Sequence, residues 1–172
     1  MKKEKSLYTI SCFLPGKKKR CGRIKGHGCA DGWKQRIYKT KEETSAPTVA
    51  IESLFLSSVI DVKEEQAMVT LDIPGAFMQA DMDKVLHMQL EGPLAHLLRK
   101  VEPKQYSQFV ADEGGKKVVY VRLKKALYDT LRATHLFWKD LSGYLKDMGF
   151  ALNPYDRCVV NIMIDGKKCT IL

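Results

Sequence analysis

The sequence lacks any long hydrophobic run, which excludes a membrane-spanning helix. No stretch approaches the roughly 20 consecutive apolar residues that such a helix needs. A brief apolar run near the N-terminus follows a charged beginning, but polar residues interrupt it, and this pattern excludes a secretory signal. We therefore expect an intracellular protein that has no membrane partner.

Cysteines are few, odd in number and widely spaced. Cys21 and Cys29 with His27 suggest a zinc site, but the chain has no C-x-x-C pair and no second half-site, so we reject it. The five cysteines are typical of reduced, mostly buried thiols in an intracellular protein.

Acidic residues are also in short supply. The chain has 20 Asp and Glu against 29 Lys and Arg, which gives a net charge of +9. This excess favours a polyanionic partner, with nucleic acid ahead of an acidic membrane. The 172 residues, 45% hydrophobic and 28% charged, suit a single soluble domain that buries a real core.

Asp72 is the residue most suited to chemistry. Apolar residues alternate with polar ones over residues 69–73, which predicts a half-buried strand that Pro74 and Gly75 end at once. A carboxylate at the end of a strand, just before a turn, suits a ligand for Mg²⁺. The alternative is a solvent-facing aspartate near a turn, where this residue type is common.

Four blocks of the sequence resemble one family. L-D-I-P-G-A-F-M-Q-A-D-M-D at residues 71–83 is similar to the first catalytic motif of the reverse transcriptase of Ty1/copia-type retrotransposons. V-R-L-K-K-A-L-Y-D-T-L-R-A-T-H-L-F-W, at 121–138, resembles the family's L-K-K-A-L-Y-G segment and the helix after it. Residues 138–158 resemble the stretch that leads towards the family's Y-V-D-D turn, and 29–53 resemble its fingers region. The blocks occur in family order.

The resemblance implies an α+β fold, an incomplete fingers–palm unit with an antiparallel palm sheet and packed helices. Fingers would span about residues 23–66, and the palm with inserted helices about residues 67–172. The implied function is that of an RNA-directed DNA polymerase fragment from a longer polyprotein, inactive alone. The alternative is a non-catalytic, basic nucleic-acid-binding remnant of such an element.

The same resemblance implies the cofactors and partners. The complete enzyme would use two Mg²⁺ or Mn²⁺ ions, an RNA template, a DNA primer and deoxynucleoside triphosphates. The remainder of the polymerase would be a further partner. The expected location is the cytoplasm, in a virus-like particle, or the nucleus. The family's Y-V-D-D aspartates, its remaining metal ligands, would be expected just beyond Leu172.

Site residues follow from the match. Asp72 would be the catalytic metal ligand, with Asp81 and Asp83 acidic but at the surface. The backbone of Ile73, Pro74, Gly75 and Ala76 would lie beside the triphosphate. Phe77 resembles a steric gate under the sugar, with a core phenylalanine as the alternative. Lys34 and Arg36 would lie near the triphosphate, with a solvated basic loop as the alternative. The residues that would contact the template are Lys124, Lys125 and Arg132.

Three residues of the second block depart from the family pattern. Asp129 stands where the family has glycine, so a positive φ there would strain it. Arg132 replaces a glutamine, and His135 replaces a residue that is usually apolar. These departures suggest a decayed or truncated copy.

Periodicity and turn residues predict the other elements. Residues 1–22 are expected to form a basic, disordered tail, whose Lys17 to Arg20 run has nucleic-acid contact or nuclear localisation as alternatives. A D-G turn predicts a hairpin of residues 157–164 and 168–172, with residues 69–73 beside it in the palm sheet and the longest helix on one face. The predicted helices are 47–62, 93–101, 103–111 and 130–148, and the other predicted strands are 85–90 and 118–123.

Overall fold

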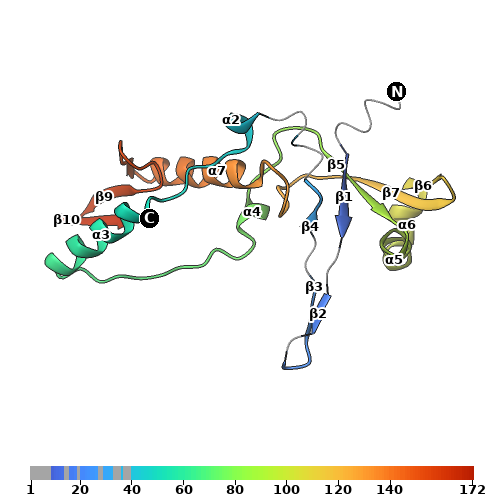
Figure 1. The fold of residues 1–172 in the computed structure, drawn as a ribbon, viewed down its shortest axis with the longest axis horizontal. Helices are drawn as coiled ribbons and strands as arrows, with labels where there is room; N and C mark the ends of the chain where they lie inside the picture. The colour runs from blue at the N-terminus through green and yellow to red at the C-terminus, as the bar shows by residue number, and fades with distance from the viewer. Residues whose placement is uncertain (1–8, 14–15, 19, 27–28, 33–35, 37–39) are drawn as a thin grey trace.

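A computed structural model describes residues 9–13, 16–18, 20–26, 29–32, 36 and 40–172. Helices and mostly antiparallel sheets are combined, so the α+β class predicted from the sequence is confirmed. Within the described residues, no helix is long and apolar enough to cross a membrane. The helix α7 (Ala133–Asp147) lies between two sheets at opposite ends of the molecule (Figure 1).

The larger sheet has five strands in the order β4-β1-β5-β7-β6. Strand β1 pairs in parallel with β5 and antiparallel with β4, and β5, β7 and β6 pair antiparallel. Leu90, Ala95 and Val119 form a buried cluster where helix α5 covers β5 and β7. The strands are β1 (Thr9–Phe13), β4 (Cys29–Ala30), β5 (His87–Glu91), β6 (Val110–Glu113) and β7 (Lys116–Arg122).

The smaller sheet has three strands in the order β10-β9-β8, all antiparallel. Asp165 and Gly166 both have positive φ, 49° and 77°, as a two-residue hairpin turn requires, and the predicted D-G hairpin is confirmed. The strands are β8 (Ala151–Leu152), β9 (Val160–Ile164) and β10 (Lys167–Ile171).

Helix bounds follow the sequence signals closely in some places and not in others. The helix predicted at 93–101 is α5 (Pro93–Val101), with proline in its first turn. The helix predicted at 130–148 is α7 (Ala133–Asp147), and Gly149 follows it with a φ of 94°. The remaining helices are α2 (Lys41–Thr44), α3 (Ile51–Lys63), α4 (Ala76–Gln79), α6 (Pro103–Tyr106) and the short 3-10 turn η2 (Ser107–Phe109).

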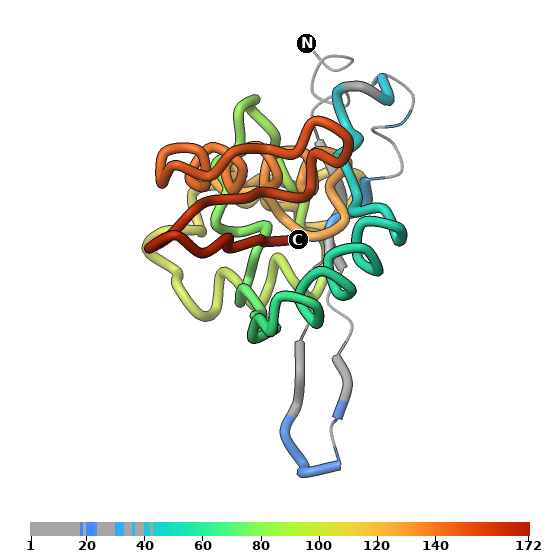
Figure 2. Tube along the Cα trace, turned by 90° about the vertical axis from the view of Figure 1, so that its left-hand side faces the viewer, coloured from blue at the N-terminus to red at the C-terminus, as the bar shows by residue number. Residues whose placement is uncertain are grey.

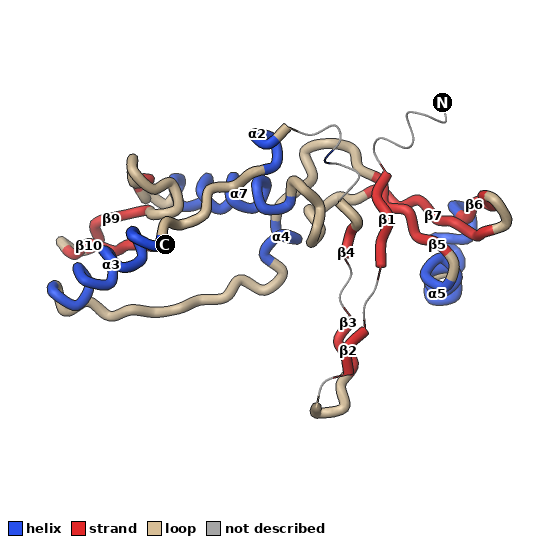
Figure 3. Tube along the Cα trace, viewed as in Figure 1, coloured by secondary structure: helices blue, strands red, loops and turns tan. Residues whose placement is uncertain are grey.

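The predicted strand at residues 69–73 is wrong. After a turn at the end of α3, residues 67–73 run as an extended loop towards α4 and belong to none of the sheets (Figure 3). Its alternating apolar side chains face solvent, with Val69 79% and Leu71 84% exposed. Among the described residues, the hairpin β9–β10 therefore pairs with the short β8 and not with residues 69–73, as the expected palm sheet required.

Two further predictions need correction. The helix predicted at 103–111 stops early, because its last residues join the hairpin of β6 with β7 instead. Residues 1–22 do not form a free tail where the structure describes them, since β1 is a sheet strand and β2 (Gly16–Lys18) pairs with β3 (Ile24–Gly26). The β2–β3 ribbon extends away from the rest of the molecule in both views (Figures 1 and 2).

Helix α3 is capped by a residue from a distant loop. Its N-cap, Ala50, has no capping side chain. Instead, the Asp156 carboxylate accepts hydrogen bonds from the Ala50 amide, at 2.8 Å, and from the Ser53 hydroxyl. These bonds, with one from the Cys158 amide, lower the pKa of Asp156. The cap therefore ties α3 to the loop before β9.

We predict that Asp156→Asn loosens α3 at neutral pH. Because the folded-state pKa of Asp156 is lowered, its contribution is present above the unfolded value of about 4 and is lost as the pH falls through the folded value. Amide hydrogen exchange over residues 51–63 should quicken several-fold in Asp156→Asn at pH 7. The stability difference from the parent chain, measured by urea unfolding, should shrink towards pH 3. Asp147→Asn, on the exposed end of α7, is the control, and equal effects of both changes would contradict the cap.

Candidate functional site

Asp72 lies in the extended loop, exposed and two residues before a turn. Residues 67–73 make no backbone hydrogen bond with any part of the chain that the structure describes. The predicted turn after Asp72 is therefore present, whereas the predicted paired strand before it is not. Its carboxylate is accessible from solvent.

The turn after Asp72 is built on Gly75, whose φ of 61° is left-handed and favours glycine. The Gly75 carbonyl accepts a hydrogen bond from the Met78 amide at 2.8 Å, which starts the single turn of α4. Ile73 and Pro74 are exposed, whereas Gly75 and Ala76 are half-buried. The backbone predicted to lie beside a triphosphate is therefore accessible on its Ile73 side.

Phe77 is half-buried in an aromatic cluster. Its ring meets that of Tyr128 edge-on at 5.0 Å between centroids and that of Phe137 at 6.0 Å. Such edge contacts contribute about 0.5–1.5 kcal/mol each beyond the buried area. The cluster is the geometry expected of a core phenylalanine, while the role of steric gate stays a prediction. Four buried residues complete this core, namely Ala80, Ala126, Ala133 and Leu136.

The chain after α4 runs beside the start of the second block. The Met82 amide donates to the Lys124 carbonyl at 2.8 Å, and the Ala126 amide donates to the Ala80 carbonyl at 2.9 Å. Lys125 Nζ lies 2.8 Å from the Asp81 carboxylate and donates to the Gln79 carbonyl at 3.0 Å. Lys124 and Lys125 are both exposed, so two predicted template residues lie on the segment that contacts the first block.

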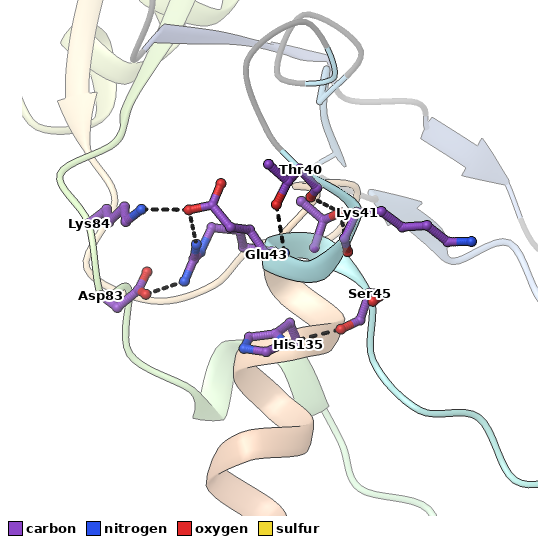
Figure 4. Close-up of polar contacts among 9 residues, drawn as sticks. Thr40, Lys41, Glu43, Ser45, Asp83, Lys84 and His135 are labelled. Atoms are coloured by element: carbon purple, nitrogen blue, oxygen red, sulfur yellow. Dashed lines mark hydrogen bonds and ion pairs between the residues drawn. The ribbon is translucent and has the colours of Figure 1, made fainter.

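Arg132 is engaged within the chain. Its guanidinium pairs with the Asp83 carboxylate and lies 3.6 Å from the Glu43 carboxylate, and its side chain is only 11% exposed. Lys84 also pairs with Glu43, at 2.9 Å. Figure 4 shows Glu43 on α2 facing Lys84, with Asp83 beside them. A template contact by Arg132 stays a prediction and would require it to leave these carboxylates.

His135 lies next to this ion-pair group. Its Nδ1 is 3.0 Å from the Ser45 carbonyl, just after α2 (Figure 4). Arg132 and His135, the two departures from the family pattern at the start of α7, thus both hold the α2 segment. No signal in the sequence identified Glu43 as the partner of Arg132, because it lies 89 residues before Arg132.

Asp129 has a φ of 66°, in the region that favours glycine. The expected strain at this position is therefore present, and it costs about 1–2 kcal/mol. The backbone there is also crowded, because a Cβ added to Gly32 would lie 2.2 Å from the Asp129 carbonyl oxygen. The Ala30 amide donates to the Tyr128 carbonyl at 3.2 Å, so residues 29–32 dock on the second block at this turn.

Two hollows adjoin each other along the start of α7 and share Thr44 and Thr134. The larger, of about 530 Å³, includes Arg36 and Asp129 in its wall, and the smaller, of about 340 Å³, includes Phe77. Asp72, Lys124 and Lys125 line neither. Lys34 lies outside the described residues.

The residues around Asp72 do not form a complete metal site. Within the described part of the chain, no three His, Cys, Asp or Glu side chains lie close enough together to hold an ion. Asp81 and Asp83 are exposed, as predicted, and their carboxylates pair with Lys125 and Arg132. Asp72 by itself offers one carboxylate.

Comparisons with known proteins give no further assignment. The chain matches no family model, no curated protein and no solved structure. The interpretation of the site consequently depends on the four sequence blocks and on the contacts between them.

We predict that Arg132→Gln destabilises the chain. It leaves Asp83 and Glu43 without their shared, nearly buried cation, which should cost about 1–2 kcal/mol of unfolding free energy. Lys84→Gln removes a more exposed partner of the same Glu43 and should cost less than about 1 kcal/mol. Urea unfolding at low salt measures both. An Arg132→Gln chain as stable as the parent would contradict the ion-pair geometry.

Proposed function

We propose that this chain is part of an RNA-directed DNA polymerase of the Ty1/copia type, comprising its fingers and the first part of its palm. The observation that carries the proposal is the block from residue 71 to 83, with Asp72 ahead of the Pro74–Gly75 turn. The contacts among the blocks support it. Phe77 of the first block packs on Tyr128 and Phe137 of the second.

The fingers-like segment adds a second contact of the same kind. Ala30 and Gly32 dock on the backbone at Tyr128 and Asp129, which lie in the second block. Segments that are about 50 to 100 residues apart therefore meet around the second block. Convergence of separate motifs on one place is expected of a functional site and is not required of unrelated surface loops.

In this proposal Asp72 is one ligand of the metal ions of the complete enzyme, Mg²⁺ or Mn²⁺. The two-ion chemistry of such enzymes needs several carboxylates. The 172 residues contain no Y-V-D-D, and the described residues include no group of three His, Cys, Asp or Glu side chains that could hold an ion, so in this proposal they do not polymerise alone. The other ligands would come from the remainder of the polymerase.

Nucleic acid is the partner that the charge favours. Lys124 and Lys125 are exposed beside α4, and Arg36 is exposed at the larger hollow. With Lys34 they would contact the template, primer or triphosphate. Counterion release from a polyanion would drive such binding.

A non-catalytic, nucleic-acid-binding remnant is the second candidate. Two observations favour it: the strained φ of Asp129 and the pairing of Arg132 with Asp83 and Glu43. Asp129 is a charged residue where the family has glycine. Arg132 is a charged residue where the family has glutamine, and its carboxylate partners fix its position. The two candidates share the binding of nucleic acid and differ in whether the site can be repaired.

The first test measures binding. The chain should bind a primer–template duplex with little sequence preference, and three phosphate contacts would weaken binding about 40-fold between 50 and 200 mM salt. The double change Lys124→Gln and Lys125→Gln should reduce the slope of log affinity against log salt by about 2. The matched control is the double change Lys100→Gln and Lys104→Gln, on helices α5 and α6. Salt-independent binding, or equal loss in both double variants, would count against the interface.

The second test measures synthesis. The unmodified chain should extend no primer with Mg²⁺ or Mn²⁺. A longer chain that continues through a Y-V-D-D turn, with Asp129→Gly and Arg132→Gln, should extend primers and should lose that activity on Asp72→Asn. The remnant predicts no recovery in the longer chain. Synthesis by the 172 residues that survives Asp72→Asn would show that the assignment of Asp72 is wrong.

A further inference from the structure

The chain exposes an unusual amount of apolar surface at one end. None of the residues of α3 is buried, and its Phe55 and Leu56 are 64% and 66% exposed. Val69 and Leu71 of the extended loop are exposed further still, and Ile171 and Leu172 at the end of β10 are partly exposed. Soluble monomers rarely expose so much apolar surface in one region, and such surfaces usually mark an interface.

Two unpaired backbone edges accompany this surface. Residues 67–73 are extended and have no described backbone partner. Among the described strands, β10 pairs with β9 on one side only, so its other side offers amides and carbonyls with no described strand partner. Each edge is a template for strand addition.

The loop is held at both ends, so it has little slack to reach its own β10. The Gln66 amide donates to the Asp61 carbonyl at 2.8 Å at the end of α3, and the Gly75 carbonyl accepts from Met78 at the start of α4. Between these points the chain is drawn out alongside the rest of the molecule (Figure 3). Since an extended residue spans at most about 3.6 Å, the segment cannot swing far without undoing one end. A pairing strand must therefore come to it.

We infer that two copies of this chain associate by exchanging these edges, with residues 67–72 of one copy pairing antiparallel to residues 167–172 of the other. This register overlaps the full length of β10 and places Asp72, the only charge in the segment, opposite Lys167. It also places Met68 opposite Ile171 and Thr70 opposite Cys169. Opposite charges and apolar pairs directly across an antiparallel ladder contribute about 0.2–1 kcal/mol each.

A second copy closes the arrangement. Each chain carries both edges, so a two-fold axis forms two identical joints and leaves neither edge open. Helix α3 has 13 residues. Together with the loop and the β9–β10 hairpin, it supplies the roughly 20–30 residues a side that a stable interface needs. The inference is independent of the proposed polymerase function, because it uses only the edges and the apolar surface.

Sedimentation equilibrium on the 172-residue chain tests association. A dimer is expected, and Leu71→Lys should weaken it at least tenfold, since it adds a charge opposite Lys168. Leu71 is solvent-exposed in the single chain, so its replacement should leave folding unchanged, as circular dichroism would verify. Leu97→Lys, on exposed α5, is the matched control and should leave the dimer intact. A monomer at 100 μM, or equal weakening by both changes, would overturn the inference.

A cross-link tests the register. Thr70→Cys should form an intermolecular disulfide with Cys169 under mild copper–phenanthroline oxidation, identified by mass spectrometry of the joined peptides. Adding Cys169→Ser should abolish that link. Ser58→Cys, on α3, should not link to Cys169. A link from Thr70→Cys only within one chain, or to other cysteines in preference to Cys169, would overturn the proposed pairing.

Discussion

The packing of residues 76–82 against residues 124–137 is the contact on which the rest of the site depends. Phe77 fills the space between Tyr128 and Phe137, and the Ala126 amide bonds to the Ala80 carbonyl. The small residues Ala80 and Ala126 let the two backbones approach, because a larger side chain would separate them. The start of α7, the docking of Ala30 on Tyr128 and the end of the loop with Asp72 all adjoin this contact.

The same contact explains why Asp72 lies away from the other residues of the site. Its loop is fixed at one end by the turn at Gly75 and at the other by α3, which the Asp156 carboxylate holds against the loop before β9. Between these points the apolar side chains of the loop are exposed to solvent. This extended segment alternates like a strand and has no backbone partner among the described residues, so its backbone is available to the second copy that we propose.

Local signals predicted the local structure well. The proline at the start of α5, the glycine after α7 and the D-G turn of the β9–β10 hairpin each act within a few residues, and all three elements are present. The strand at 69–73 was predicted from alternation, which reports a preference for pairing but not whether a partner strand exists. No local sequence pattern identified the contacts between residues that are distant along the chain. Asp156 caps a helix 106 residues away, and Glu43 pairs with Arg132, because only the fold brings them together.

We propose that residues 71–83 belong to a polymerase active site whose other carboxylates are encoded in the same reading frame. The most direct measurement is the coding sequence beyond the codon for Leu172, read from genomic DNA and from transcripts. The account predicts an uninterrupted frame that encodes an x-V-D-D turn within the next few codons. A frame that continues without such a turn, or a stop codon followed by out-of-frame similarity, would contradict the enzyme and leave the non-catalytic remnant.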